Sequence, residues 1–166
     1  MKRCINWIAP LACLGLLSCS PGEGAGASAL AAAPAAAANT HPVSGLRIVP
    51  LTVTSKGKVH KFRVELASTP EEQGRGLMFR NALGPYEGMI FPSMPPGPRS
   101  FWMKNTPLPL DIIFVGVDGR ILNIAARTTP YSLDALASQG PTSGVLELAG
   151  GRAAELGIGV GDTVRW

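Results

Sequence analysis

The sequence predicts a mainly β fold: a compact single-domain β-sandwich or barrel-like structure with two short helices. Apolar and polar side chains alternate over residues 61–66, as in a strand with one solvent-exposed face. Residues 112–117 form a continuous apolar run, which is typical of a strand buried on both faces. The chain also has 20 glycines and 15 prolines, which divide it into short segments. Many short strands with such frequent interruptions favour a sandwich or barrel.

The clearest single element is a hairpin. Asp118 and Gly119 separate the apolar run at 112–117 from a second run at 120–124, and an Asp-Gly pair between two apolar runs is a strong hairpin signal. Further strands are expected at residues 47–54, 88–91, 100–103, 145–148 and 163–166.

Two short helices are expected between the strands. Thr69 precedes Pro70, and Glu72 follows three residues after the threonine. This is the pattern of a capping box with proline at the first helical position. A second helix is expected over residues 151–156, because Gly157 can end it in the left-handed conformation.

Residues 1–18 resemble a secretory signal peptide. A positive head precedes an apolar run at 5–17, which is shorter than the ~20 residues of a spanning helix. Residues 16–19 resemble a bacterial lipobox, in which the cysteine is acylated, for example with palmitate. The resemblance implies a lipoprotein anchored through Cys19. It would lie in the cell envelope, at the periplasmic side of the outer membrane if the host is Gram-negative. The alternative is an ordinary signal that is cleaved later.

The domain organisation follows from composition. Residues 19–45 are rich in Ala, Gly and Pro and are expected to form a flexible tether. Residues 46–166 are long enough for one folded domain. Cys4 and Cys13 lie in the signal, so the domain has no thiol. This excludes disulfides, a cysteine nucleophile and thiolate metal ligands from the domain.

Charge argues against nucleic acid as a partner. The formal net charge is +4, and removing Lys2 and Arg3 with the signal leaves 13 basic against 11 acidic residues, or +2. So small a surplus on an exported domain does not indicate nucleic-acid binding.

Three motifs carry a resemblance to a known family. They are Gln73-Gly74-Arg75-Gly76-Leu77-Met78-Phe79-Arg80; Gly88-Met89-Ile90-Phe91 with Phe101-Trp102-Met103-Lys104-Asn105-Thr106; and Val145-Leu146-Glu147-Leu148 with Val160-Gly161-Asp162. In order and spacing they resemble DUF192, also called UPF0127, across essentially the whole domain. The resemblance implies a small β-rich, sandwich-like fold and no particular activity.

Six side chains within or beside these motifs form the candidate ligand site. They are Arg75, Arg80, Trp102, Lys104, Asn105 and Asp111. Asp111 precedes a buried strand, so its carboxylate must be paired or hydrogen-bonded. One interpretation is a structural ion pair with Lys104 or an arginine. Another is a polar pocket for an anionic or sugar-like ligand, with Trp102 as its apolar wall. A third is catalysis by Asp111.

Other residue types offer little chemistry. Met78, Met89 and Met103 have large apolar neighbours and are expected in the core, as are Trp102 and Phe114, whereas Met94 is expected to be exposed. The only histidines, His41 and His60, cannot form a catalytic triad or a multi-histidine metal site. We therefore expect no metal and no cofactor. The basic group of Lys56, Lys58, Lys61 and Arg63 is either a solvated hairpin face that protects an edge strand or a contact with an anionic envelope surface.

The sequence thus predicts a non-catalytic, envelope-anchored binding or accessory module of unknown activity. Its expected partners are the membrane, through the lipid on Cys19, and an unknown small-molecule or envelope ligand. The alternative is an envelope hydrolase with Asp111 as its acidic residue. An enzyme would need a second titratable group beside Asp111 in a cleft, whereas a binding module needs only a concave site.

Overall fold

The computed structural model describes residues 39–166. The expected signal peptide, Cys19 and most of the expected tether lie outside the described residues. Within 39–166, no helix has both the length and the apolar character needed to cross a membrane.

The described chain is mainly β with two short helices, as the sequence predicts. In chain order the elements are β1 (Ile48–Ser55), β2 (Lys58–Leu66), α1 (Pro70–Arg75), β3 (Glu87–Gly97), β4 (Ser100–Phe101), β5 (Leu110–Gly116), β6 (Ile121–Ala125), β7 (Leu136–Ala137), β8 (Thr142–Ala149), α2 (Arg152–Leu156) and β9 (Thr163–Arg165).

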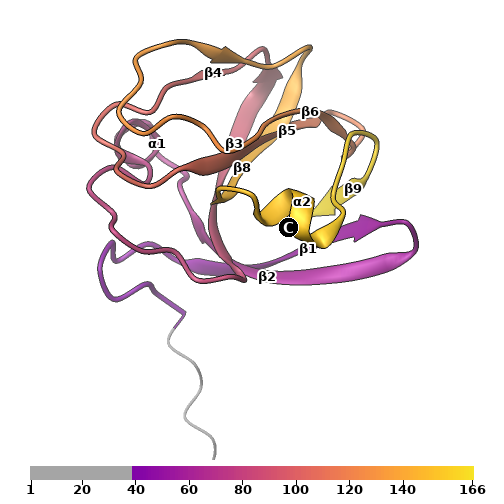
Figure 1. Cartoon of the computed structure of the whole chain (residues 1–166), viewed down its shortest axis with the longest axis horizontal. Helices are drawn as coiled ribbons and strands as arrows, with labels where there is room; N and C mark the ends of the chain where they lie inside the picture. Colours follow the sequence, from indigo (N-terminus) through magenta and orange to yellow (C-terminus); the bar gives the residue numbers. More distant parts are fainter. Residues whose placement is uncertain (1–38) are drawn as a thin grey trace, which may run out of the picture. The chain divides into compact units, whose positions relative to one another are not determined.

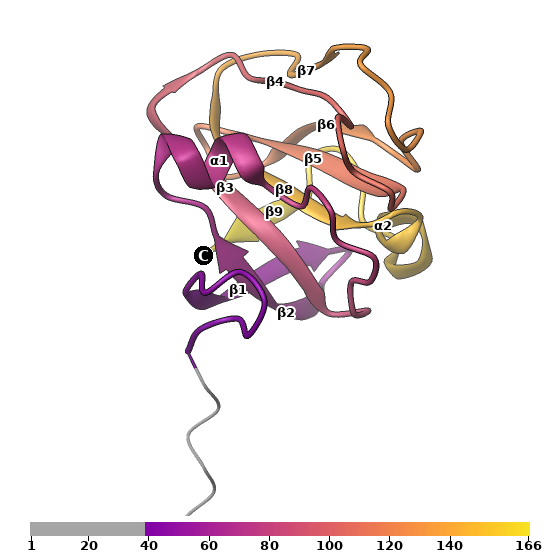
Figure 2. The same ribbon diagram turned by 90° about the vertical axis from the view of Figure 1, so that its left-hand side faces the viewer.

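Seven of these strands form one mixed sheet in the order β6-β5-β8-β3-β2-β1-β9, while β4 and β7 pair separately. β2 and β3 are parallel, and the other neighbouring strands are antiparallel. The sheet curls, so that β1 and β2 lie on one side and β5 and β6 on the other (Figure 1 and Figure 2). It does not close into a barrel, although a bridge between Arg120 and Thr163 links the turn before β6 to β9. This arrangement is compatible with a sandwich-like fold.

Each face of the sheet carries an apolar cluster. One cluster joins β1 and β2 to α2 and β9 through side chains such as Leu51, Val64 and Ala153. The other contains Met89, Phe91 and Phe114. α1 lies in front of the upper part of β3, with the β4–β7 pair above it (Figure 2). The second face is the one that carries the candidate site.

Local sequence signals account for both helices and the hairpin. The Thr69 side chain accepts a hydrogen bond from the Glu72 N–H, and the Glu72 carboxylate accepts one from the Thr69 N–H, so the predicted capping box is confirmed. Gly157 ends α2 in the left-handed conformation, as expected. β5 and β6 pair on either side of the Asp118–Gly119 turn.

Three expectations need correction. β3 continues through the proline-rich segment to Gly97, because a register shift after Pro92 lets Gly97 pair with Thr142. The strand expected at 100–103 is only two residues long. Ordered structure begins before residue 46, since Thr40 forms a bridge with Arg47 and the residue 39 carbonyl accepts a hydrogen bond from Ile48.

The core expectations are mostly confirmed. Phe114, Met89 and Met103 are buried, and Met94 is 89% exposed, whereas Met78, also expected in the core, is only partly buried. Trp102 is wrongly expected in the core: it is 50% exposed and lines a cavity, because β4 ends one residue before it.

Candidate functional site

A buried carboxyl group without a partner marks the most distinctive site in the described structure. Glu147 lies on β8, opposite Met89 of β3 and Ile112 of β5. Its side chain therefore points to the same apolar sheet face as Val145, two residues away. Glu147 is 5% exposed, and its Oε2 atom has no hydrogen-bond partner. Because a buried polar group without a partner is costly, such a group needs a functional or structural reason.

Glu147 lines a cavity of about 400 Å³, which we call the Glu147 cavity. This volume lies within the range of small-molecule sites. Its wall combines apolar side chains with two arginines, and Glu147 is the only carboxylate among the described lining residues. The main lining side chains are Gln73, Arg75, Leu77, Met78, Phe91, Arg99, Phe101, Trp102, Thr106 and Glu147.

The two cations reach the cavity from different elements. Arg75 lies in the last turn of α1 and is exposed. Arg99 lies just before β4, where its guanidinium donates to the Gln73 Oε1 atom at 2.8 Å. The Gln73 amide in turn donates to the carbonyls of Ala67 and Pro92. Gln73 thus fixes Arg99 at the cavity, whereas Arg75 forms no ion pair within residues 39–166.

The aromatic wall is also fixed by neighbours. Phe101 packs edge-on against Phe91 and Phe114, with ring centroids 5.1 and 6.1 Å apart. The Lys104 ammonium lies 5.1 Å from the centre of the Trp102 ring. That cation–π contact stabilises the indole where it lines the cavity, and Trp102 is 50% exposed.

Two glycines make this geometry possible. Gly76, which also lines the cavity, ends α1 at φ +48°, a conformation that L side chains rarely adopt. At Gly88 a Cβ atom would lie 2.4 Å from the Glu147 carbonyl oxygen. Glycine at 88 therefore lets β3 approach β8 closely beside Glu147.

Burial changes the acidity of this carboxyl group. With no partner charge or hydrogen bond to favour the ionised form, desolvation raises the pKa of Glu147 from 4.5 to about 8. Glu147 is therefore mainly protonated at pH 7, and it can donate a hydrogen bond into the cavity as well as accept one.

Asp111 serves a different purpose. It is fully buried on β5, and its carboxylate accepts three backbone hydrogen bonds of 2.8 Å, from Arg127, Gly151 and Ala153. These contacts tie β5 to the segment after β6 and to the start of α2. The expected ion pair with Lys104 or an arginine is not present among residues 39–166, because backbone N–H groups already satisfy both oxygens. Asp111 does not line the Glu147 cavity.

The other sequence-predicted residues are dispersed. Arg75 and Trp102 line the Glu147 cavity, and Lys104 stacks on Trp102. Arg80 instead forms an ion pair of 2.8 Å with Glu65. Asn105 adopts a positive φ of 53°, and its carbonyl accepts a hydrogen bond from the Phe79 N–H. Asn105 therefore supports a turn, whereas Arg80 stabilises β2.

The comparisons with known proteins agree with this fold. The family model described as "DUF192: Uncharacterized ACR, COG1430" matches residues 51–166. The chain belongs to the DUF192 family.

Two solved structures are similar to this DUF192 protein. One is a protein of unknown function from Novosphingobium aromaticivorans, with 58% identity, a TM-score of 0.75, and coverage of 82% of this chain and 94% of that chain. The other, from Sinorhizobium meliloti, is named "putative transcription regulator"; it has 36% identity, a TM-score of 0.70, and coverage of 72% and 94%. No curated protein matches the chain.

Sequence reasoning missed Glu147, Arg99 and Gln73 in this DUF192 domain. Glu147 lies within the apolar run at 145–148, and a carboxyl in a buried strand is the signal that singled out Asp111. The same test applied to Glu147 would have found it. Arg99 and Gln73 are 26 positions apart in the sequence, and they come into contact only in the folded domain. Over residues 39–166, no group of three or more His, Cys, Asp or Glu side chains is placed to hold a metal ion.

Proposed function

We propose that the domain binds a small, anionic, hydroxyl-bearing ligand, such as a sugar acid, in the Glu147 cavity. The observation that carries this proposal is the buried Oε2 atom of Glu147, which has no partner in the protein. A ligand hydroxyl at that position would both accept from and donate to the neutral carboxyl group, and so relieve the cost of its burial.

The rest of the cavity suits the same ligand. Arg99, held by Gln73, presents a guanidinium for bidentate contact with a carboxylate, and Arg75 adds a second positive charge. The exposed half of the Trp102 ring offers a flat apolar surface for a sugar ring.

Binding is better supported than hydrolysis. Most glycoside hydrolases need two carboxyl groups that flank the scissile bond. The described lining of the Glu147 cavity contains one carboxyl group, that of Glu147. Asp111 is not in this lining, and both of its carboxylate oxygens already accept backbone hydrogen bonds. A hydrolase would have to use Glu147 alone.

The proposal is tested with D-glucuronate as the probe and the chain from Ser20 onward, which retains only Trp102 and Trp166 as tryptophans. We expect saturable quenching of Trp102 fluorescence by glucuronate and weaker quenching by D-glucose, which lacks the carboxylate. Arg99→Gln should weaken binding by roughly 10-fold or more, since it removes a charge-assisted hydrogen bond. Arg120→Gln, on the exposed hairpin, is the matched control and should leave affinity unchanged. Equal affinity for glucose, or no effect of Arg99→Gln, would contradict the proposal.

We further propose that the domain is held at the cell envelope by lipid on Cys19. The lipobox-like residues 16–19 and the absence of any thiol after Cys19 support this. The proposed location brings the cavity near soluble envelope sugars.

Anchoring predicts a specific processing defect. In cells supplied with labelled palmitate, the native chain should incorporate the label, and Cys19→Ser should abolish incorporation and block maturation at this site. Cys13→Ser, within the expected signal, should change neither. Normal maturation of the Cys19→Ser chain would refute lipid anchoring.

A further inference from the structure

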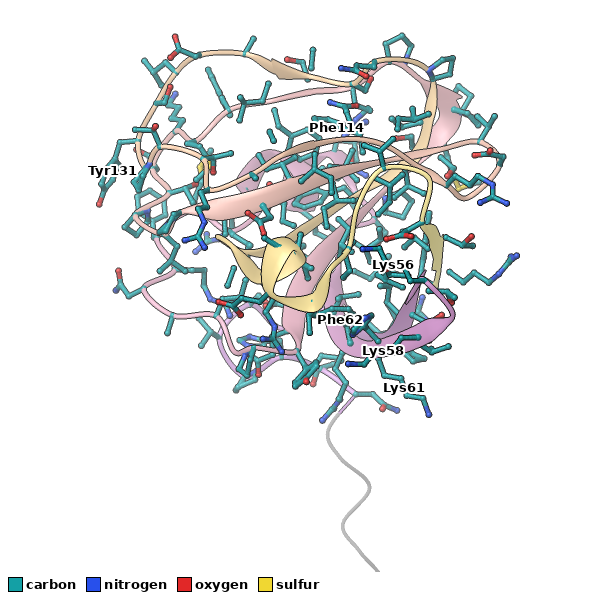
Figure 3. All side chains as sticks on the ribbon, turned by 45° about the vertical axis from the view of Figure 1, so that its right-hand side comes forward. Lys56, Lys58, Lys61, Phe62, Phe114 and Tyr131 are labelled. Atoms are coloured by element: carbon teal, nitrogen blue, oxygen red, sulfur yellow. The ribbon has the colours of Figure 1, made fainter. Side chains whose placement is uncertain are left out.

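A second surface is strongly basic. It is formed by the side of the β1–β2 hairpin that faces away from the core. Four exposed cations contribute to it, and none forms an ion pair within the described residues. They are Lys61 and Arg63 of β2, Arg165 of β9, and Lys56 at the tip of the hairpin. Lys58 pairs with the buried Ser55 and therefore points to the opposite side of the sheet. Figure 3 labels Lys56, Lys58 and Lys61 along this hairpin. We call this surface the basic face.

Strand register explains why the charges gather. Thr52 of β1 lies opposite both Lys61 of β2 and Arg165 of β9, so these cations share one side of the sheet. The outward positions of β1 and β9 in the paired region carry threonine, proline and Arg165, with no carboxylate. At the margin, Glu87 of β3 pairs in register with Arg63. The face as a whole is positive.

A cavity opens beside the basic face. It measures about 420 Å³, and its lining combines Lys61 and Arg63 with Glu65 and Glu87 and with apolar side chains that include Phe62 and Tyr86. We call it the Phe62 cavity. The centroids of the Phe62 and Tyr86 rings are 5.9 Å apart. The Arg152 guanidinium lies 4.6 Å from the centroid of the Tyr86 ring and so helps to fix that ring. Glu65, which also lines this cavity, is neutralised by its 2.8 Å ion pair with Arg80.

The incoming chain enters the domain at this cavity. His41 lines it and lies 3.7 Å from Glu65, and the Ser44 hydroxyl donates to the same carboxylate. The 19 residues from 20 to 38 separate Cys19 from this point of entry at residue 39. If they form the tether that the sequence predicts, their root-mean-square span is roughly 25 Å. A lipid on Cys19 would therefore keep the Phe62 cavity close to the leaflet.

We infer that the basic face and the Phe62 cavity form a docking surface for a bilayer leaflet that contains anionic phospholipid. Lys61 and Arg63 contact lipid phosphate, and the apolar part of the cavity lining, with Phe62 and Tyr86, receives the glycerol and upper acyl region of one lipid. The remaining cations add attraction that is screened by salt. This inference deepens the proposed envelope location by assigning the side of the domain that faces the membrane.

The test uses the unlipidated chain from Ser20 onward, because the related chain at 58% identity consists almost entirely of the matching region and is folded in its crystal. We expect it to sediment with vesicles of phosphatidylglycerol and phosphatidylcholine but not with phosphatidylcholine alone, and to be released by high salt. Replacing Lys61, Arg63 and Arg165 with glutamine should weaken binding by at least 10-fold. The matched control removes three cations elsewhere, by Arg75→Gln, Lys104→Gln and Arg120→Gln, and should retain most of the binding.

Equal loss in the two triple variants would overturn the inference, since net charge rather than this face would then be responsible. Equal binding to soluble polyphosphate would also overturn it, because the partner would then be a soluble polyanion. Neither outcome depends on acylation, so failure here is distinguishable from failure of the Cys19 experiment.

Discussion

Asp111→Asn should lower the free energy of unfolding by roughly 3–5 kcal/mol. The native carboxylate accepts three backbone hydrogen bonds, two at Oδ1 and one at Oδ2. An amide offers one acceptor oxygen, and its NH₂ group would face at least one of the same N–H donors. The variant therefore loses charge-assisted bonds and leaves a buried donor without a partner, in a site where Asp111 has no exposure to water.

The measurement is urea unfolding of the native and variant chains. Asp118→Asn is the matched control: its Oδ1 accepts one hydrogen bond, from the Arg120 N–H, in an exposed turn, and asparagine can replace it there. Adding Lys104→Gln to Asp111→Asn should recover none of the lost stability, because no cation balances Asp111. A loss below about 1 kcal/mol, or recovery in the double variant, would show that the three backbone bonds do not stabilise the fold.

Glu147→Gln should make the domain more stable than the native chain at alkaline pH. The pKa of Glu147 is raised by burial to about 8, against 4.5 for the unfolded group. Between these values the unfolded chain is ionised at this residue and the folded chain is protonated, so folding takes up a proton. Rising pH therefore destabilises the native chain from about pH 4.5 to about pH 8, and the effect is complete above that window.

Glutamine cannot ionise and fills nearly the same volume. We expect native and Glu147→Gln chains to have similar stability near pH 4.5 and to diverge by roughly 3–5 kcal/mol by pH 9, with the variant more stable. Urea unfolding at pH 5, 7 and 9 measures this, with the exposed Glu71→Gln as the control that should keep the native pH dependence. Parallel curves for the Glu147→Gln and native chains would mean that the carboxyl is solvated and that the cavity lacks its buried acid.

Short-range signals in the sequence were sufficient for much of the fold. The hairpin at Asp118–Gly119 and the capping box at Thr69 depend on neighbouring residues, so their patterns identify them directly. The course of β3 was not predictable in the same way. Proline lacks a donor, and only the distant Thr142 lets the strand resume pairing at Gly97.

The candidate site was harder to predict, because its geometry depends on long-range contacts. Arg75 and Trp102 were identified from their motifs, yet Glu147, which lines the same cavity, lies 72 residues after Arg75 and 45 after Trp102. The sequence indicates that the Asp111 carboxylate must be hydrogen-bonded, but it does not identify the donors. They are backbone N–H groups, which nearly every residue has, so residue types do not reveal them. Whether Trp102 lies in the core or lines a cavity depends on where the two-residue strand β4 ends, which no local pattern specifies.

The pairing of β9 with β1 has a consequence for folding. Thr163 of β9 pairs with Thr54 of β1, which lies 109 positions earlier in the chain, so β1 gains its second neighbour through a contact between distant segments. Such non-local pairing slows folding, because a long loop must close before the contacts that stabilise it form. The local β1–β2 hairpin is therefore expected to form first, and the sheet is completed at β9 only afterwards.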